Sequence, residues 1–211
     1  MATYNKGILG PFTGTVGTVV GANWRGKNVM RSLPKKTGNT PTPAQLVQRE
    51  RFAVVSKFLT PLRPLLNRYF GTSTGVQSNF NLATSYHIKE ACLVQNNTPT
   101  MVYNKVLITK GELQGLQEAT LTTNNKLLFT WADNSGQGQA LATDTLLVVI
   151  YAPDLHLFEV FETQTTRQAK KATLTAEAYF TGVPIHIWAT FVNSTKKTAA
   201  VSQYLGTVIL N

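Results

Sequence analysis

The feature that most constrains the fold is an alternation of apolar and polar residues that begins near residue 100. Alternation with period two is typical of half-buried strands, and turn-forming residues interrupt it roughly every ten positions. The pattern predicts strands over residues 101–109, 119–123, 126–131, 145–151, 156–163, 172–176, 185–192 and 201–210. Short strands at this spacing indicate an antiparallel β-sandwich of the immunoglobulin class.

The cysteine content narrows the kind of sandwich that we expect. Cys92 is the only cysteine, so one chain cannot form the intersheet disulfide of antibody domains. A single cysteine also excludes a cysteine-based zinc site within one chain. A fibronectin-like arrangement is therefore the closer analogy.

The residues before 100 follow other patterns. Residues 13–33 predict two β-rich runs broken near residues 25–28, where Gly26 can adopt the positive φ of a tight hairpin turn. A proline-studded connector follows over residues 34–43. Thr42 as N-cap, Pro43 in the first helical position and Gln45 three residues after the cap predict a capping box that starts a helix.

Two helical segments are predicted after that cap. Apolar residues recur at steps of three and four and form one stripe: Phe52, Val55, Leu59, Leu62, Leu66 and Tyr69. Pro61 and Pro64 should break or restart this helix after Thr60. A second helix over residues 78–91 places these side chains on one side: Phe80, Ala83, Thr84, His87 and Ala91. The predicted fold class is α+β, mainly β, with a hairpin and helices over residues 1–98 and an immunoglobulin/fibronectin-like antiparallel β-sandwich over residues 99–211.

The formal charge of +10 is confined to the first third of the chain. Residues 1–71 contain eleven lysines and arginines against one acidic residue, whereas residues 72–211 contain nine basic and nine acidic residues. Such asymmetry is typical of a segment that meets phosphate or an acidic partner. The predicted nucleic-acid or polyanion-binding residues are Arg25, Lys27, Arg31, Lys35, Lys36, Arg49, Lys57, Arg63 and Arg68.

One loop is spaced like a calcium-binding loop. Asp133, Ser135, Gln137 and Asp144 occupy its first, third, fifth and twelfth positions, and Gly138 occupies the sixth. The flanking segments are predicted strands instead of helices, and only two carboxylates would neutralise the ion. The alternative is a hydrogen-bonded turn between two strands, and this alternative is favoured.

The three histidines lack the spacing of a catalytic or metal site. His87, His156 and His186 lie on different predicted elements, with no second histidine, cysteine or acid at ligand spacing nearby. We therefore expect surface or satisfied core histidines, no catalytic residue, no cofactor and no enzyme. Convergence of His156, His186 and an acid in one pocket would instead favour an enzyme.

Several motifs together resemble a known family. They are the glycine-rich run 7–21, Trp24-Arg-Gly, Arg31-Ser-Leu-Pro-Lys-Lys, the segment 42–52 with its Gln-x-x-x-Arg-x-x-Phe spacing, Trp131-Ala-Asp-Asn-Ser-Gly and Thr143-Asp144. These motifs resemble a domain-of-unknown-function family of short bacterial proteins. Similar openings are found in small phage and prophage proteins, so the resemblance implies a mobile-element or virion setting and carries no catalytic residues.

These observations lead to two expectations of function. The first is a structural protein that assembles with further copies of itself, with its basic segment facing nucleic acid or an acidic partner. The alternative is a sequence-independent DNA-binding protein. The start lacks a secretory pattern and the longest apolar run is too short to span a bilayer, so we expect cytoplasmic synthesis, no membrane partner and no small-molecule substrate.

Overall fold

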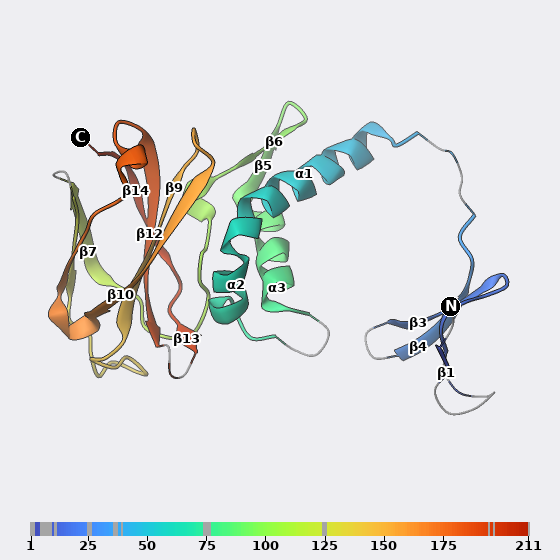
Figure 1. The fold of residues 1–211 in the computed structure, drawn as a ribbon, viewed down its shortest axis with the longest axis horizontal. Helices are drawn as coiled ribbons and strands as arrows, with labels where there is room; N and C mark the ends of the chain where they lie inside the picture. The colour runs from blue at the N-terminus through green and yellow to red at the C-terminus, as the bar shows by residue number, and fades with distance from the viewer. Residues whose placement is uncertain are drawn as a thin grey trace.

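The computed structural model describes residues 3–4, 10, 12–24, 27–35, 38, 40–73, 77–123, 126–193, 195 and 197–210. The fold is mainly β, with several antiparallel sheets and a group of helices. Figure 1 shows a small N-terminal sheet, an extended connector, a helical part and a larger β part in chain order. Among the described residues, no helix is long and apolar enough to cross a membrane.

Two sheets make up the larger β part. The first has the order β10 (Leu157–Thr166), β9 (Thr145–Ala152), β12 (Pro184–Asn193) and β13 (Thr198–Ala199), with β14 (Gln203–Ile209) also paired to β12. The second has the order β11 (Lys171–Leu174), β8 (Leu127–Ala132) and β7 (Gln117–Thr123). Side chains from both sheets meet in one buried cluster, here called the intersheet core, which includes Phe129, Ile150 and Phe191.

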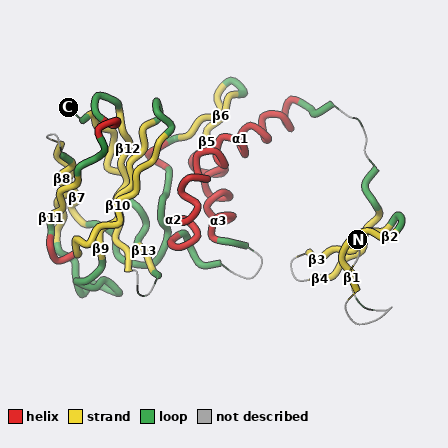
Figure 2. Tube along the Cα trace, in the orientation of Figure 1, coloured by secondary structure: helices red, strands yellow, loops and turns green. Residues whose placement is uncertain are grey.

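The helices cover the other face of the larger sheet (Figure 2). They are α1 (Pro43–Leu59), the short 3₁₀ turn η1 (Thr60–Leu62), α2 (Arg63–Tyr69), α3 (Asn79–Tyr86) and the π-turn η2 (His87–Ala91). Leu59 and Leu66 pack with Val149 and Trp188 in a second cluster, here called the helix–sheet core. The boundary predicted between residues 98 and 99 therefore lies inside a region that shares one core.

Burial on two faces explains the sequence of the central strand β9. Leu146, Val148 and Ile150 face the intersheet core, whereas Leu147 and Val149 face the helices. A strand covered on both faces is apolar along its whole length instead of alternating. The apolar run at residues 146–152 is the sequence signature of this central position.

The predicted start and break of the first helix are confirmed. The Thr42 hydroxyl accepts from the Gln45 backbone N–H at 3.3 Å, and the Gln45 side chain accepts from the Thr42 N–H at 3.1 Å. The helix is interrupted at Thr60–Leu62 and resumes at Arg63, as Pro61 and Pro64 require. The predicted stripe is buried except at Phe52, whose side chain is 56% exposed because the first half of α1 extends beyond the core.

The strand predicted over residues 101–109 is wrong. The structure has a hairpin of β5 (Cys92–Gln95) and β6 (Thr98–Met101), followed by a 3₁₀ turn, η3 (Tyr103–Lys105). Asn96 and Asn97 have φ values of 49° and 63°, the left-handed pair that a two-residue hairpin turn needs. The buried backbone N–H of Ile108 then donates to the Ser202 hydroxyl at 2.8 Å, so its hydrogen bond is made outside a ladder.

The N-terminal sheet has the order β1 (Thr3–Tyr4), β2 (Phe12–Val16), β3 (Val19–Trp24) and β4 (Lys27–Ser32). The first predicted β-run is thus divided at Gly17, which has a φ of +58°. The turn predicted at Gly26 lies outside the described residues. Among the residues of β2, β3 and β4, none belongs to either buried core.

Candidate functional site

The register of the N-terminal sheet places its two described cationic side chains, Lys27 and Arg31, on one face. Residues directly opposite each other in an antiparallel pair share a face, and successive residues alternate between faces. The pairs Val16 with Val19 and Gly21 with Met30 therefore lie on one face. We call this the apolar face, and its large side chains are Phe12, Val16, Val19 and Met30. On the opposite, basic face lie Thr13, Thr15, Val20, Ala22, Trp24, Lys27, Val29 and Arg31.

The apolar face is open to solvent in the single chain. The side chains of Val16, Val19 and Met30 are 53%, 39% and 73% exposed. The ring of Phe12 lies over Gly21, where an added Cβ would meet both that ring and the Phe12 carbonyl oxygen. The sheet is thus apolar at its centre on one side, which is a surface suited to packing against another sheet.

The predicted basic residues have different surroundings in the structure. Arg25 and Lys36 lie outside the described residues, while Lys27, Arg31, Lys35 and Arg49 are exposed. The Arg63 guanidinium lies 5.1 Å from the centre of the Phe80 ring. Arg68 forms an ion pair with Glu162 at 3.3 Å and also lies over the Tyr69 ring. Lys57 lines a groove described below.

The loop that was considered for calcium is a hydrogen-bonded turn in the structure. Asp133 accepts from the backbone N–H of Ser135 at 3.0 Å and from the Ser135 hydroxyl. Asp144 is fully buried and accepts from Leu141 N–H and from the Asn193 side-chain amide, each at 2.9 Å. The two carboxylates therefore serve separate networks, and the described residues contain no group of three or more His, Cys, Asp or Glu that could hold a metal.

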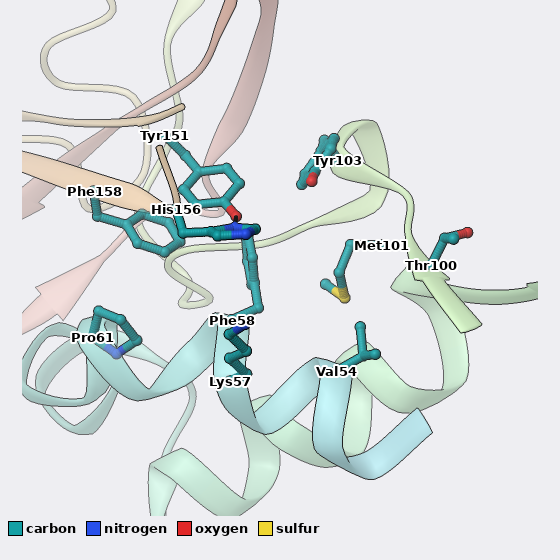
Figure 3. A pocket seen from close by; sticks show the side chains of 10 residues that line it. All are labelled: Val54, Lys57, Phe58, Pro61, Thr100, Met101, Tyr103, Tyr151, His156 and Phe158. Carbon is teal, nitrogen blue, oxygen red and sulfur yellow. Dashed lines mark hydrogen bonds between the residues drawn. The ribbon is translucent and has the colours of Figure 1, made fainter. Parts of the chain in front are cut away.

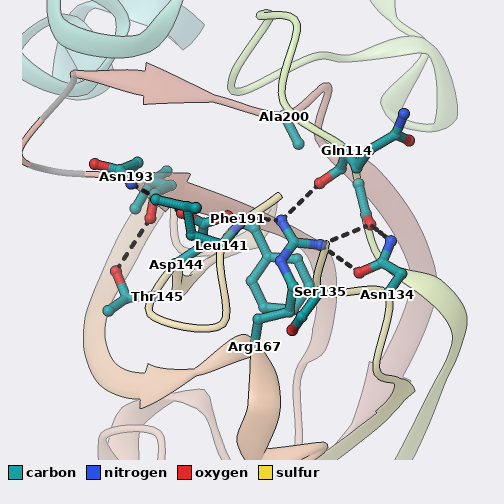
Figure 4. Close-up of polar contacts among 12 residues, drawn as sticks. Gln114, Asn134, Ser135, Leu141, Asp144, Thr145, Arg167, Phe191, Asn193 and Ala200 are labelled. Atoms are coloured by element: carbon teal, nitrogen blue, oxygen red, sulfur yellow. Dashed lines mark hydrogen bonds and ion pairs between the residues drawn. The ribbon is translucent and has the colours of Figure 1, made fainter. Parts of the chain in front are cut away.

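Asp144 also belongs to a buried ion pair that sequence reasoning missed (Figure 4). Arg167 lies 3.2 Å from the Asp144 carboxylate, and both side chains are fully buried. Its guanidinium donates to the Gln114 carbonyl at 2.9 Å and lies 4.0 Å from the centre of the Phe191 ring. Burial lowers the pKa of Arg167 from its ordinary value, although the neighbouring Asp144 carboxylate opposes the shift. This network connects three segments outside the strands: the one before β7, the one between β8 and β9, and the one between β10 and β11. We interpret it as structural.

A groove of about 600 Å³ that combines aromatic and polar side chains lies between α1 and the β9–β10 hairpin. Figure 3 shows the side chains that line it: Val54, Lys57, Phe58, Pro61, Thr100, Met101, Tyr103, Tyr151, His156 and Phe158. Of these ten residues, only Lys57 and His156 are candidate functional residues in the sequence. The remainder come from segments up to a hundred residues apart, so no spacing in the sequence groups them.

Four aromatic rings form the wall and floor of the groove. The ring centres of Tyr151 and Phe158 are 4.3 Å apart, and Phe58 meets each of them edge-on at 5.1 and 5.0 Å. The Tyr103 ring centre lies 5.7 Å from that of Tyr151 and 4.0 Å from that of His186, the cross-strand neighbour of Tyr151. Burial raises the pKa of Tyr103 to about 12, so its hydroxyl stays protonated and can donate a hydrogen bond.

The structure brings two of the three histidines to this tyrosine pair. His156 Nδ1 lies 3.4 Å from the Tyr151 hydroxyl, while His186 Nδ1 bonds to the Tyr204 hydroxyl at 2.8 Å behind Tyr103. Within the described ranges neither histidine forms an ion pair with a carboxylate. His87 is the satisfied core histidine that was expected, with its Nδ1 2.7 Å from the Ala83 carbonyl.

Comparison with known proteins identifies a family without assigning a role. Residues 11–206 match the family described as "Family of unknown function (DUF6266)". No curated protein matches the chain.

Proposed function

Since the chain belongs to this family of unknown function, we propose a role from its own surfaces: a non-enzymatic structural protein that assembles through its N-terminal sheet. The observation that carries the proposal is the exposed apolar face of that sheet. A small sheet needs a second layer against its apolar face to be stable. In the described structure neither the helices nor the two larger sheets supply that layer.

A second copy of the same sheet fits the open face better than any charged partner. Stacking two apolar faces about a two-fold axis would bury Val16, Val19 and Met30 of both copies. Lys27 and Arg31 lie on the opposite face, so the like charges of the two copies would point away from the contact. The resulting pair of sheets would present basic residues on both of its outer surfaces.

The outward basic faces support contact with nucleic acid or an acidic protein surface. Lys27, Arg31, Lys35 and Arg49 are exposed, and cations on such a surface displace counterions from phosphates when they bind. A setting in a phage or mobile-element particle follows from the resemblance of the N-terminal motifs to short bacterial and prophage proteins. In each of these settings the protein would assemble on a polyanion, either nucleic acid or an acidic protein surface.

The order of the strands supports a fibronectin-like sandwich for the larger β part. In chain order β7 and β8 lie in the smaller sheet, β9 and β10 in the larger, β11 in the smaller, and β12 and β14 in the larger. Constant-type immunoglobulin domains place the fourth strand with the first two, so the present order differs from them at that strand. Sandwiches of this kind serve mainly as binding and structural modules, which agrees with the proposed role.

Sedimentation velocity of the full chain tests self-association, with two neighbouring substitutions as a matched pair. Val16→Asp places a charge on the apolar face, whereas Thr15→Asp places the same charge on the opposite face of the same strand. We expect a concentration-dependent dimer or larger assembly, a dissociation constant raised at least about tenfold by Val16→Asp, and little change with Thr15→Asp. A monomer at every concentration and salt, or equal effects of both variants, would overturn the proposal.

The alternative function, sequence-independent DNA binding, is supported by exposed basic residues such as Lys27, Arg31, Lys35 and Arg49. If Lys27, Arg31, Lys35 and Arg49 each meet a phosphate of duplex DNA, log K should fall with log salt at a slope of about −3.6. Fluorescence anisotropy with two unrelated duplexes measures that slope. A flat salt dependence, or a strong preference for one duplex, would sink this alternative.

A further inference from the structure

The aromatic groove has the size and composition of a small-ligand site instead of a packing defect. Its volume of about 600 Å³ lies within the usual range of roughly 300–1,000 Å³ for ligand pockets. It opens between α1 and the β9–β10 hairpin, and its lining is mainly aromatic and aliphatic (Figure 3). A few polar groups converge on this apolar surface, which is the arrangement that fixes the orientation of a bound molecule.

The rings are held in place by contacts outside the groove. Tyr103 packs against the neighbouring rings of Tyr151 and His186, and His186 is bonded to both Tyr204 and Thr207, at 2.8 and 3.0 Å. Phe58 and Tyr151 are 6% and 7% exposed, so their edges form a rigid floor. A preformed aromatic floor favours a flat, apolar body because such a body loses little freedom when it binds.

The charge of the side chains that line the groove indicates which polar group a bound ligand would carry. Among the ten described residues that line the groove, Lys57 is the only permanently charged one and none is a carboxylate. The other polar groups are the hydroxyls of Thr100, Tyr103 and Tyr151 and the ring of His156. An ammonium beside hydroxyl donors favours a single negative charge and disfavours a cation.

We propose that this groove binds a small organic anion with a flat aromatic body and one carboxylate. The body lies against the rings of Phe58, Tyr103 and Phe158, and the carboxylate lies toward Lys57 Nζ. The site is separate from the N-terminal sheet, so it goes beyond the proposed assembly role and does not depend on it. The sequence led us to expect no small-molecule substrate, and the proposal is for binding only.

Three probes of one shape test the inference with the full chain. They are 2-naphthoate, 2-naphthalenemethanol and 2-naphthylmethylamine, which share the ring system and differ in charge. Titrations followed by ¹H–¹⁵N NMR should give the order naphthoate, then alcohol, then amine. The shifted amides should cluster at Lys57, Thr100 and Met101.

Two charge-removing variants of the same helix locate the carboxylate. Lys57→Gln should weaken naphthoate binding about three- to fivefold and leave the alcohol unchanged, since an exposed ion pair contributes little more than that. Arg49→Gln removes an equal charge from α1 outside the groove and should leave both affinities unchanged. The inference fails if no probe binds below about 5 mM, if the shifts map elsewhere, or if both variants act alike.

Discussion

Protonation of His87 should destabilise the fold, and the size of the effect follows from its two hydrogen bonds. The ring is fully buried. Its Nδ1–H donates to the Ala83 carbonyl, and its Nε2 accepts from the Leu107 backbone N–H at 3.3 Å. A second proton on Nε2 would point at that N–H, so the fold accommodates only the neutral ring.

Burial lowers the pKa of His87 from 6.5 to about 4. The unfolded chain therefore binds more protons than the folded chain between these two values, and stability falls as the pH falls through that window. The contribution is complete above pH 6.5. The linkage relation gives a loss of about 2 kcal/mol between pH 7 and pH 5, growing to about 3 kcal/mol at pH 4.

Urea denaturation of the wild type and His87→Gln at pH 7 and pH 5 measures this loss. Glutamine can still accept from Leu107 N–H and does not titrate, so it keeps the acceptor and removes the proton. The variant should be less stable at pH 7 but should lose about 2 kcal/mol less than the wild type on acidification. Equal losses in both proteins would refute the assignment of a neutral ring with a lowered pKa.

Three other substitutions test separate parts of the fold. Arg167→Ala leaves Asp144 buried without its partner and should lower the free energy of unfolding by about 3–5 kcal/mol, measured by chemical denaturation. The double variant Arg167→Ala with Asp144→Ala should lower it by less than the sum of the two single variants. Thr42→Ala removes half of the capping box and should cost about 1 kcal/mol, with reduced helical circular dichroism. Asn97→Gly relieves a left-handed residue in the β5–β6 turn and should raise the unfolding free energy by about 0.5 kcal/mol.

The sequence predicted best the elements whose signals are local. The capping box at Thr42 and the break at Pro61 depend on a few neighbouring residues, and the structure has both. Seven of the predicted strands overlap strands of the two sheets because each has one face in the intersheet core. The β5–β6 hairpin was missed because its strands are short and Pro99 interrupts the expected pattern.

What the sequence could not show is which side chains meet across the chain. In the sequence, Arg63 and Arg68 count with the other cations. Only the folded chain shows that Arg63 lies over the Phe80 ring and that Arg68 forms an ion pair with Glu162. Arg167 resembles any surface arginine in the sequence, although it is fully buried. The groove likewise depends on the packing of α1 against β9 and β10, which no periodicity encodes.

The two proposed surfaces lie on different parts of one chain, and α1 connects them. Its first half extends from the connector with Leu46 and Phe52 46% and 56% exposed, and its second half supplies Lys57 and Phe58 to the groove. Because the apolar face of the N-terminal sheet shares no lining residue with the groove, Val16→Asp should change assembly without changing naphthoate affinity. Lys57→Gln should do the reverse. If either variant changed both properties, the helix would be coupling the two surfaces, and assembly would then respond to the ligand by reciprocal linkage.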